Sequence, residues 1–177
     1  VTHSYLFVED IVRQANINQT MVDDPVDGPQ VRTSLSGLPT LVLASGYNNF
    51  FGPIDGIYSH PNNRGFGWER PCSAELINTD GSTAFHVNCG VRLYGGAGRG
   101  SNKKSFRLLF KGIYGPTKLE YPMFGPDAAQ QFDTLIFRME SNDGYQWGNR
   151  TTVQYARDEF SRRSQRDMGS PASHGRY

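Results

Sequence analysis

The feature that most constrains this fold is an Asp80-Gly81 pair between two segments in which apolar and polar residues alternate. An Asp-Gly pair in this setting is a strong signal for a two-residue type I′ turn between antiparallel strands. The sequence therefore predicts a β-hairpin with strands at Pro71–Asn78 and Thr83–Tyr94, in which Thr79 faces Ser82.

The predicted hairpin has one apolar and one polar face, as a sheet with one buried side requires. The apolar face carries Cys72, Ala74 and Leu76 opposite Cys89, Val87 and Phe85, and the polar face carries Ser73, Glu75 and Ile77 opposite Asn88, His86 and Ala84. Cys72 then lies opposite Cys89, within reach of a disulfide. The alternative is two unbonded thiols side by side, while two cysteines without other ligands at metal-binding spacing argue against zinc.

The remaining pattern predicts an α+β, β-rich fold: an antiparallel sheet with long ordered loops and a C-terminal helix. Twenty Gly and ten Pro indicate many turns and short strands. Further strands are expected at 38–44, 105–111 and 134–139, loops at 16–37 and 45–70, a helix at 152–168, and a strand or helical turn at 5–12. The helix is expected to end at a glycine cap, Gly169.

The chain of 177 residues is long enough for one domain with a core of its own. Its formal net charge of +1 gives no reason to expect nucleic acid or an anionic membrane as a partner. No apolar run is long enough to insert into a membrane. The start at Val1 indicates a mature or trimmed product, and the sequons at Asn18 and Asn149 are too short a pattern to carry weight.

A glycine-rich loop between two predicted strands is the first candidate site. Its glycines let backbone amides approach a phosphate, and basic side chains lie beside them. The candidate nucleotide-binding residues are Gly96, Gly98, Arg99, Gly100, Lys103 and Lys104, with Glu159 of the helix as a carboxylate partner for either lysine. The alternative is a tight hairpin connection with solvated charges that never meet Glu159.

Aromatic residues in two loop regions are the second candidate site, for a carbohydrate or a protein partner. Flat rings match sugar faces while nearby amides bond hydroxyls, although the same rings would also serve to fill a loop core. The candidate contact residues are Tyr47, Phe50, Trp68, Tyr145 and Trp147. The acids Asp23, Asp24 and Asp27 lack calcium-loop spacing and are interpreted as solvated, so no metal site is predicted.

Several blocks of sequence resemble the opening of CotH-type (spore-coat-protein-H-like) atypical kinase domains of large secreted bacterial proteins. The blocks are Gly56-Ile57-Tyr58, Arg64-Gly65, Trp68-Glu69-Arg70-Pro71, Asn88–Leu93, Gly95-Gly96, Lys103–Leu108, Tyr114-Gly115 and Arg157–Phe160. The resemblance covers roughly residues 38–177, with 1–37 as an N-terminal extension. Its most specific part is the Lys-Lys-Ser-Phe-Arg block that follows the Gly-Gly loop.

The resemblance implies a kinase-like N-lobe, with ATP and a divalent metal as the family's cofactors and a secreted or cell-surface location. It also implies that the family's catalytic and metal-binding acids lie beyond Tyr177, so we expect no phosphoryl transfer from these residues alone. The first expectation is a non-catalytic module, a processed or truncated fragment, with a structural role in surface assembly or self-association. The alternatives are a nucleotide-binding lobe or a module that binds cell-surface protein or polysaccharide.

Overall fold

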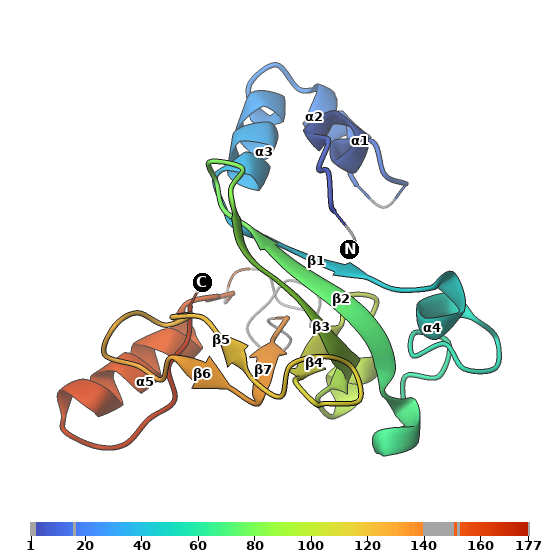
Figure 1. Cartoon of the computed structure of the whole chain (residues 1–177). Helices are drawn as coiled ribbons and strands as arrows, with labels where there is room; N and C mark the ends of the chain where they lie inside the picture. Colours follow the sequence, from blue (N-terminus) through green and yellow to red (C-terminus); the bar gives the residue numbers. More distant parts are fainter. Residues whose placement is uncertain (1–2, 16, 140–150, 152, 177) are drawn as a thin grey trace. The chain divides into compact units, whose positions relative to one another are not determined.

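The computed structural model describes residues 3–15, 17–139, 151 and 153–176. The predicted α+β class is confirmed. Figure 1 shows the long β2–β3 hairpin at the centre of a five-stranded antiparallel sheet with strand order β1-β2-β3-β4-β7. These strands span Thr40–Ala44, Arg70–Ile77, Thr83–Tyr94, Ser105–Leu109 and Thr134–Phe137, and a separate two-stranded sheet pairs β5 (Leu119–Glu120) with β6 (Gln131–Phe132).

The contacts of the chain divide it into two compact units. The first contains Val1–Ala44 and Ser73–Val87, and the second contains Ser45–Cys72 and Asn88–Tyr177. Strands β2 and β3 both pass from one unit into the other, since each has residues in both ranges.

The first unit holds three helices where the sequence suggested mostly loop. They are α1 (Val8–Val12), α2 (Gln19–Asp23) and α3 (Asp27–Ser36), so the prediction of a loop at 16–37 was wrong. The Asn18 side chain caps α2 by accepting hydrogen bonds from its first turn, and just before α3 the Asp24 carboxylate accepts them from the amides of Val26 and Asp27.

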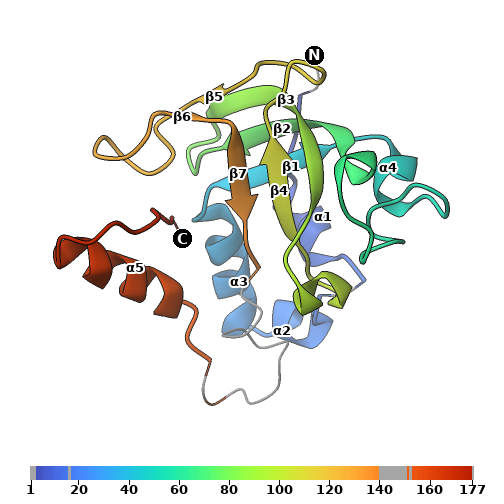
Figure 2. The same ribbon diagram turned by 90° about the horizontal axis from the view of Figure 1, so that it is seen from below.

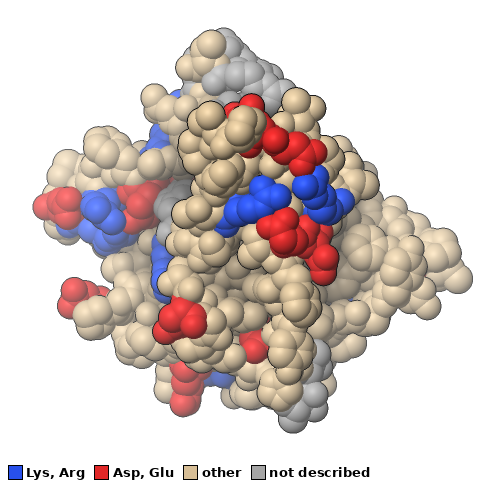
Figure 3. Space-filling model, turned by 90° about the horizontal axis from the view of Figure 1, so that it is seen from above, with Lys and Arg blue, Asp and Glu red and all other residues tan. Residues whose placement is uncertain are grey.

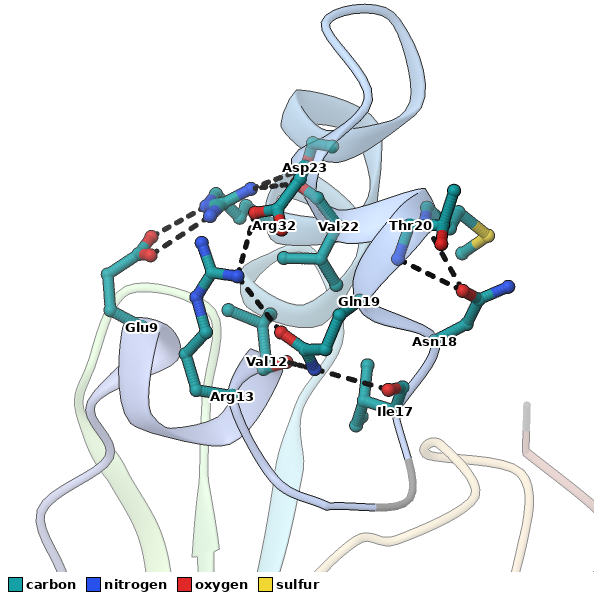
Figure 4. A network of polar contacts seen from close by, with 12 residues as sticks. Glu9, Val12, Arg13, Ile17, Asn18, Gln19, Thr20, Val22, Asp23 and Arg32 are labelled. Atoms are coloured by element: carbon teal, nitrogen blue, oxygen red, sulfur yellow. Dashed lines mark hydrogen bonds and ion pairs between the residues drawn. The ribbon is translucent and has the colours of Figure 1, made fainter.

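A polar network fastens these three helices to one another (Figure 4). Arg32 donates to both carboxylate oxygens of Glu9 at 2.6 and 3.0 Å, and also to the carbonyls of Val22 and Gly28. Beneath the network Val12 and Val22 are almost completely buried. The helices therefore have a small apolar centre of their own.

The hairpin turn differs from the predicted type I′ turn. Asn78 and Ser82 face each other through a hydrogen bond from the Asn78 amide to the Ser82 carbonyl. Gly81 has φ of 82°, and no non-glycine residue in the described part of the chain has positive φ, so Asp80 cannot adopt a type I′ conformation. The Asp80 carboxylate instead accepts hydrogen bonds from the amide and hydroxyl of Ser82.

The changed turn shifts the cross-strand contacts near it. Ser73 was expected opposite Asn88, and Glu75 opposite His86. In the structure Ser73 hydrogen-bonds with His86 at 2.7 Å, and Thr83 donates to Glu75 at 2.9 Å. Glu75 is buried, although the sequence placed it on the polar face.

The second unit is built around strands β3, β4 and β7, which lie side by side in Figure 2. Their register places Val91, Leu108 and Leu135 in one row, and all three are buried. The next row on the other face of the sheet is Arg92, Arg107 and Ile136. The predicted alternation therefore separates a buried apolar face from a half-exposed face that carries arginines.

The ordered loop at 45–70 contains short helical turns, α4 (Tyr47–Phe51) and η1 (Phe66–Trp68), and the loop after β3 contains η2 (Ala97–Gly100). The final helix, α5, spans Arg157–Asp167, shorter than predicted. Gly169 follows it with φ of 79°, as a glycine cap requires. None of the residues of α5 is buried.

Candidate functional site

The glycine-rich loop lies against a cavity of about 300 Å³ in the second unit. Three loop glycines contribute to the wall, and Gly95 among them has φ of 108°, which favours glycine. The cavity is lined by Tyr94, Gly95, Gly96, Gly98, Ser105, Arg138 and Met139. The sequence thus identified two lining residues, Gly96 and Gly98, among its candidates, whereas Gly100 is not part of the wall.

Arg99 does not line this cavity, because its guanidinium is engaged elsewhere. It is buried and donates to the carbonyls of Pro61 and Asn63 at 2.6 Å each, and to the carbonyl of Leu93. Desolvation lowers the pKa of Arg99, and the nearby charges of Arg64 and Arg92 lower it further. Arg99 therefore fastens the 61–63 segment to the end of β3.

Lys104 is held within the loop in the same way. Its Nζ donates to the carbonyls of Arg99 and Ser101 at 2.8 and 2.9 Å and lies 5.1 Å from the centre of the Tyr58 ring. Burial, followed by the charge of Arg99, lowers the pKa of Lys104. Lys103 is exposed on the loop.

The predicted partner of these lysines, Glu159, pairs with arginines of its own helix. Its carboxylate lies 3.3–3.8 Å from Arg162, Arg163 and Arg166. Within the described residues no ion pair joins Glu159 to Lys103 or Lys104. The Lys–Glu pair expected from the kinase-like arrangement is therefore not formed.

Arg138 is the cation that lines the cavity, and sequence reasoning did not select it as a site residue. It follows β7 directly, and its guanidinium pairs with Asp158 at the start of α5. Next to it the Met139 amide donates to the Ser105 hydroxyl at 3.0 Å, which ties this segment to β4. The sequence did offer one signal for Arg138: it directly follows a short apolar strand, β7, and that strand pairs with β4, the strand after the glycine-rich loop.

A second charged cluster, around Glu69, was also not anticipated. The Glu69 side chain is only 2% exposed. Lys111 donates to both of its oxygens at 2.9 and 2.8 Å, the Tyr114 hydroxyl donates at 3.3 Å, and Arg92 lies 3.5 Å away. Burial, together with the Glu69 charge, raises the pKa of Tyr114.

The two cysteines lie within hydrogen-bonding distance of each other across the hairpin, but no disulfide joins them. Both are buried, and Cys89 is completely so. The hydrogen bond with Cys72, followed by desolvation, raises the pKa of the Cys89 thiol well above its ordinary value of 9.0. A thiol of this kind is a poor nucleophile at neutral pH.

The aromatic candidates separate into buried and exposed groups. Phe50 is buried and contacts Phe51, Tyr58 and Phe106, so it fills a core. Tyr47 is 73% exposed and lies against Phe51, whereas half-buried Trp68 packs against other side chains. The partners of Trp68 are His60 and Arg70. Tyr145 and Trp147 lie outside the described residues.

Two further findings cover the part of the chain that the structure describes. No group of three or more His, Cys, Asp or Glu side chains is arranged to hold a metal ion there. No helix there has the length and apolar character that a membrane crossing needs.

On the face drawn in Figure 3, acidic and basic side chains lie next to one another, so this face has no broad area of a single charge sign.

Comparisons with known proteins give no match: no family model, no curated protein and no solved structure is similar to this chain. The functional argument therefore depends on the cavity and its surroundings.

Proposed function

We propose that this chain is a nucleotide-binding lobe of the CotH-type lineage, in which the glycine-loop cavity holds a phosphate group. The single observation that carries the proposal is the cavity itself, with three glycines and Arg138 in its wall. The family part of the proposal, and with it an extracellular location, depends on the Gly-Gly and Lys-Lys-Ser-Phe-Arg blocks. The proposed role is binding, without phosphoryl transfer by this chain.

The glycines support phosphate binding for a steric reason. A glycine has no Cβ, so a ligand oxygen can approach the backbone amides of the loop closely. At Gly96 an added Cβ would meet no atom within 4 Å, which shows that the space beside this residue is open. The cavity volume of about 300 Å³ lies at the lower end of the range for small-molecule sites.

Arg138 supplies a charge suited to a phosphate. A guanidinium can donate two parallel hydrogen bonds to phosphate oxygens, and its side chain here is 40% exposed, so a ligand can reach it. Asp158 accepts from part of this donor group in the structure. We expect a phosphate to compete with that carboxylate for Arg138. Lys104 and Arg99 would maintain the conformation of the loop through their hydrogen bonds to backbone carbonyls.

The test is an ATP titration by calorimetry of the unmodified chain and of Arg138→Ala. We expect ATP binding that weakens at least about tenfold in the variant, because a charge-assisted contact is lost. Lys103→Ala is the matched control, since it removes the same charge from an exposed loop position outside the cavity wall. No ATP binding by the unmodified chain, or equal binding by Arg138→Ala, would refute the proposal.

A structural role in surface assembly is the second candidate, and exposed apolar side chains around α4 favour it. Tyr47, Phe51 and Ile54 are 73%, 49% and 79% exposed. Such groups commonly mark an interaction surface. Sedimentation velocity over a range of concentrations tests this candidate: we expect self-association that Tyr47→Ser together with Ile54→Ser abolishes, and a monomer at every concentration would remove it.

A further inference from the structure

The arginines on the open face of the sheet have too few acidic partners. Arg92 and Arg107 lie directly opposite each other on β3 and β4. Like charges in this position repel each other, so the pair is unfavourable unless an anion lies near it. Among the described residues, the carboxylate that pairs with Arg92 is Glu69, and both of its oxygens already accept hydrogen bonds from Lys111.

Arg107 is the less satisfied of the two. Within the described residues it has no carboxylate partner, and its Nε is buried without a hydrogen-bond acceptor. A buried donor without an acceptor carries a desolvation cost, and an anion beside the partly exposed remainder of the Arg107 side chain would offset it. Its neighbour across β7 is Ile136, an apolar side chain that offers no acceptor.

The location of Arg107 links it to the cavity. Its guanidinium carbon lies 4.7 Å from the centre of the Tyr94 ring, and Tyr94 lines the cavity. On the adjacent segment Arg138, two residues beyond Ile136, lines the cavity as well. A group bound at the glycine loop would therefore have Arg107 as its neighbour on the sheet side.

We propose that Arg107, with Arg92 beside it, forms a second anion subsite next to the glycine-loop cavity, so that the ligand is a polyphosphate rather than a single phosphate group. This inference rests on the proposed function, because it needs the first phosphate to occupy the cavity at Arg138. The further phosphate then lies over the sheet face, where it neutralises the Arg107 charge that no carboxylate of the described residues neutralises.

The experiment compares two probes without a nucleoside, inorganic orthophosphate and tripolyphosphate, by calorimetry at one fixed salt concentration. The unmodified chain is expected to bind tripolyphosphate at least about tenfold more tightly, because the longer anion meets additional guanidinium groups. Arg107→Gln is expected to abolish this preference and to leave orthophosphate affinity within about twofold. Arg138→Gln is expected to weaken both probes.

Lys103→Gln is the control, because it removes one positive charge from an exposed loop position and should alter neither affinity. Arg107→Lys keeps the charge and is expected to retain most of the preference, which provides a second reading if Arg107→Gln does not fold by circular dichroism. Equal binding of the two probes by the unmodified chain, or a preference that survives in Arg107→Gln, overturns the second subsite alone. If neither probe binds, the proposed function fails together with it.

Discussion

Glu69 shows how a single buried carboxylate can organise several segments of this chain. A charge that is 2% exposed is stable only when partners replace its lost hydration. Lys111, Arg92 and Tyr114 provide these partners from separate parts of the sequence. Gly90 completes the arrangement, because a Cβ there would lie 2.3 Å from the Tyr114 ring.

Replacement of Lys111 by Met is expected to lower the free energy of unfolding by about 3 kcal/mol, because it leaves a buried carboxylate without its main partner. The control is Lys118→Met. Lys118 is exposed to a similar degree, 45% against 39%, but its partner Asp133 is 73% exposed. Loss of that surface pair should cost at most about 1 kcal/mol. Urea unfolding measures both values, and equal losses would contradict the assigned role of Glu69.

Also at the scale of single residues, the sequence could not identify which basic side chain lines the cavity. The glycine loop could be predicted because glycines between two strands form a local pattern. The partners of Arg99 are carbonyls 36 and 38 residues away, and Glu69 is 42 residues from Lys111. No local spacing encodes such contacts. The sequence therefore predicts Lys104 and Arg99 as phosphate ligands, whereas in the structure their side chains hydrogen-bond to backbone carbonyls and stabilise the loop.

At the scale of elements, strands were more predictable than helices. The strands at 70–77, 83–94 and 105–109 alternate apolar and polar residues, which is a strong periodic signal. Helices α2 and α3 are short, so their periodic pattern is weak. Near its start α3 contains Gly28 and Pro29, and this composition is typical of a loop. Pro is compatible with a first helical turn, because amides there have no partner within the helix.

The hairpin turn illustrates a second limit at this scale. Asp80-Gly81 correctly indicated a turn, but the turn type depends on where the Asp80 side chain bonds. Its contacts with Ser82 stabilise a conformation with negative φ at Asp80. A difference of this kind alters which residues face each other next to the turn, where Asn78 pairs with Ser82 and not with Thr83.

At the scale of the whole molecule, the first of the two units contains all the carboxyl groups whose pKa is clearly lowered, among the described residues. These are Glu9, Asp24, Glu75 and Asp80. In each case hydrogen bonds from Arg32, backbone amides or hydroxyl groups favour the ionised form. The second unit has its buried carboxylate, Glu69, in a cluster of cations instead.

This division predicts that acid weakens the first unit before the second. A carboxyl group with a lowered pKa stabilises the folded state above its ordinary pKa, here 4.5 for Glu75, and that stabilisation is lost as the pH falls through the lower folded value. NMR spectra recorded from about pH 6 to pH 3 should therefore lose native signals from α1–α3 and β1 at higher pH than those from β4 and β7.

Glu75→Gln tests the contribution of one such group to this acid response. Glu75 accepts hydrogen bonds from the Ser4 amide and the Thr83 hydroxyl. Its pKa is lowered mainly by the hydrogen bond with the Ser4 side chain, followed by that with the Thr83 side chain. The variant keeps an acceptor oxygen but cannot titrate, so the free energy of unfolding should fall less steeply between about pH 5 and pH 3 than in the unmodified chain. Glu120→Gln makes the same chemical change at an exposed site and should leave the slope as it is. If Glu75→Gln has the slope of the unmodified chain, the hydrogen bonds to Glu75 do not contribute to the stability of the first unit in the way the geometry implies.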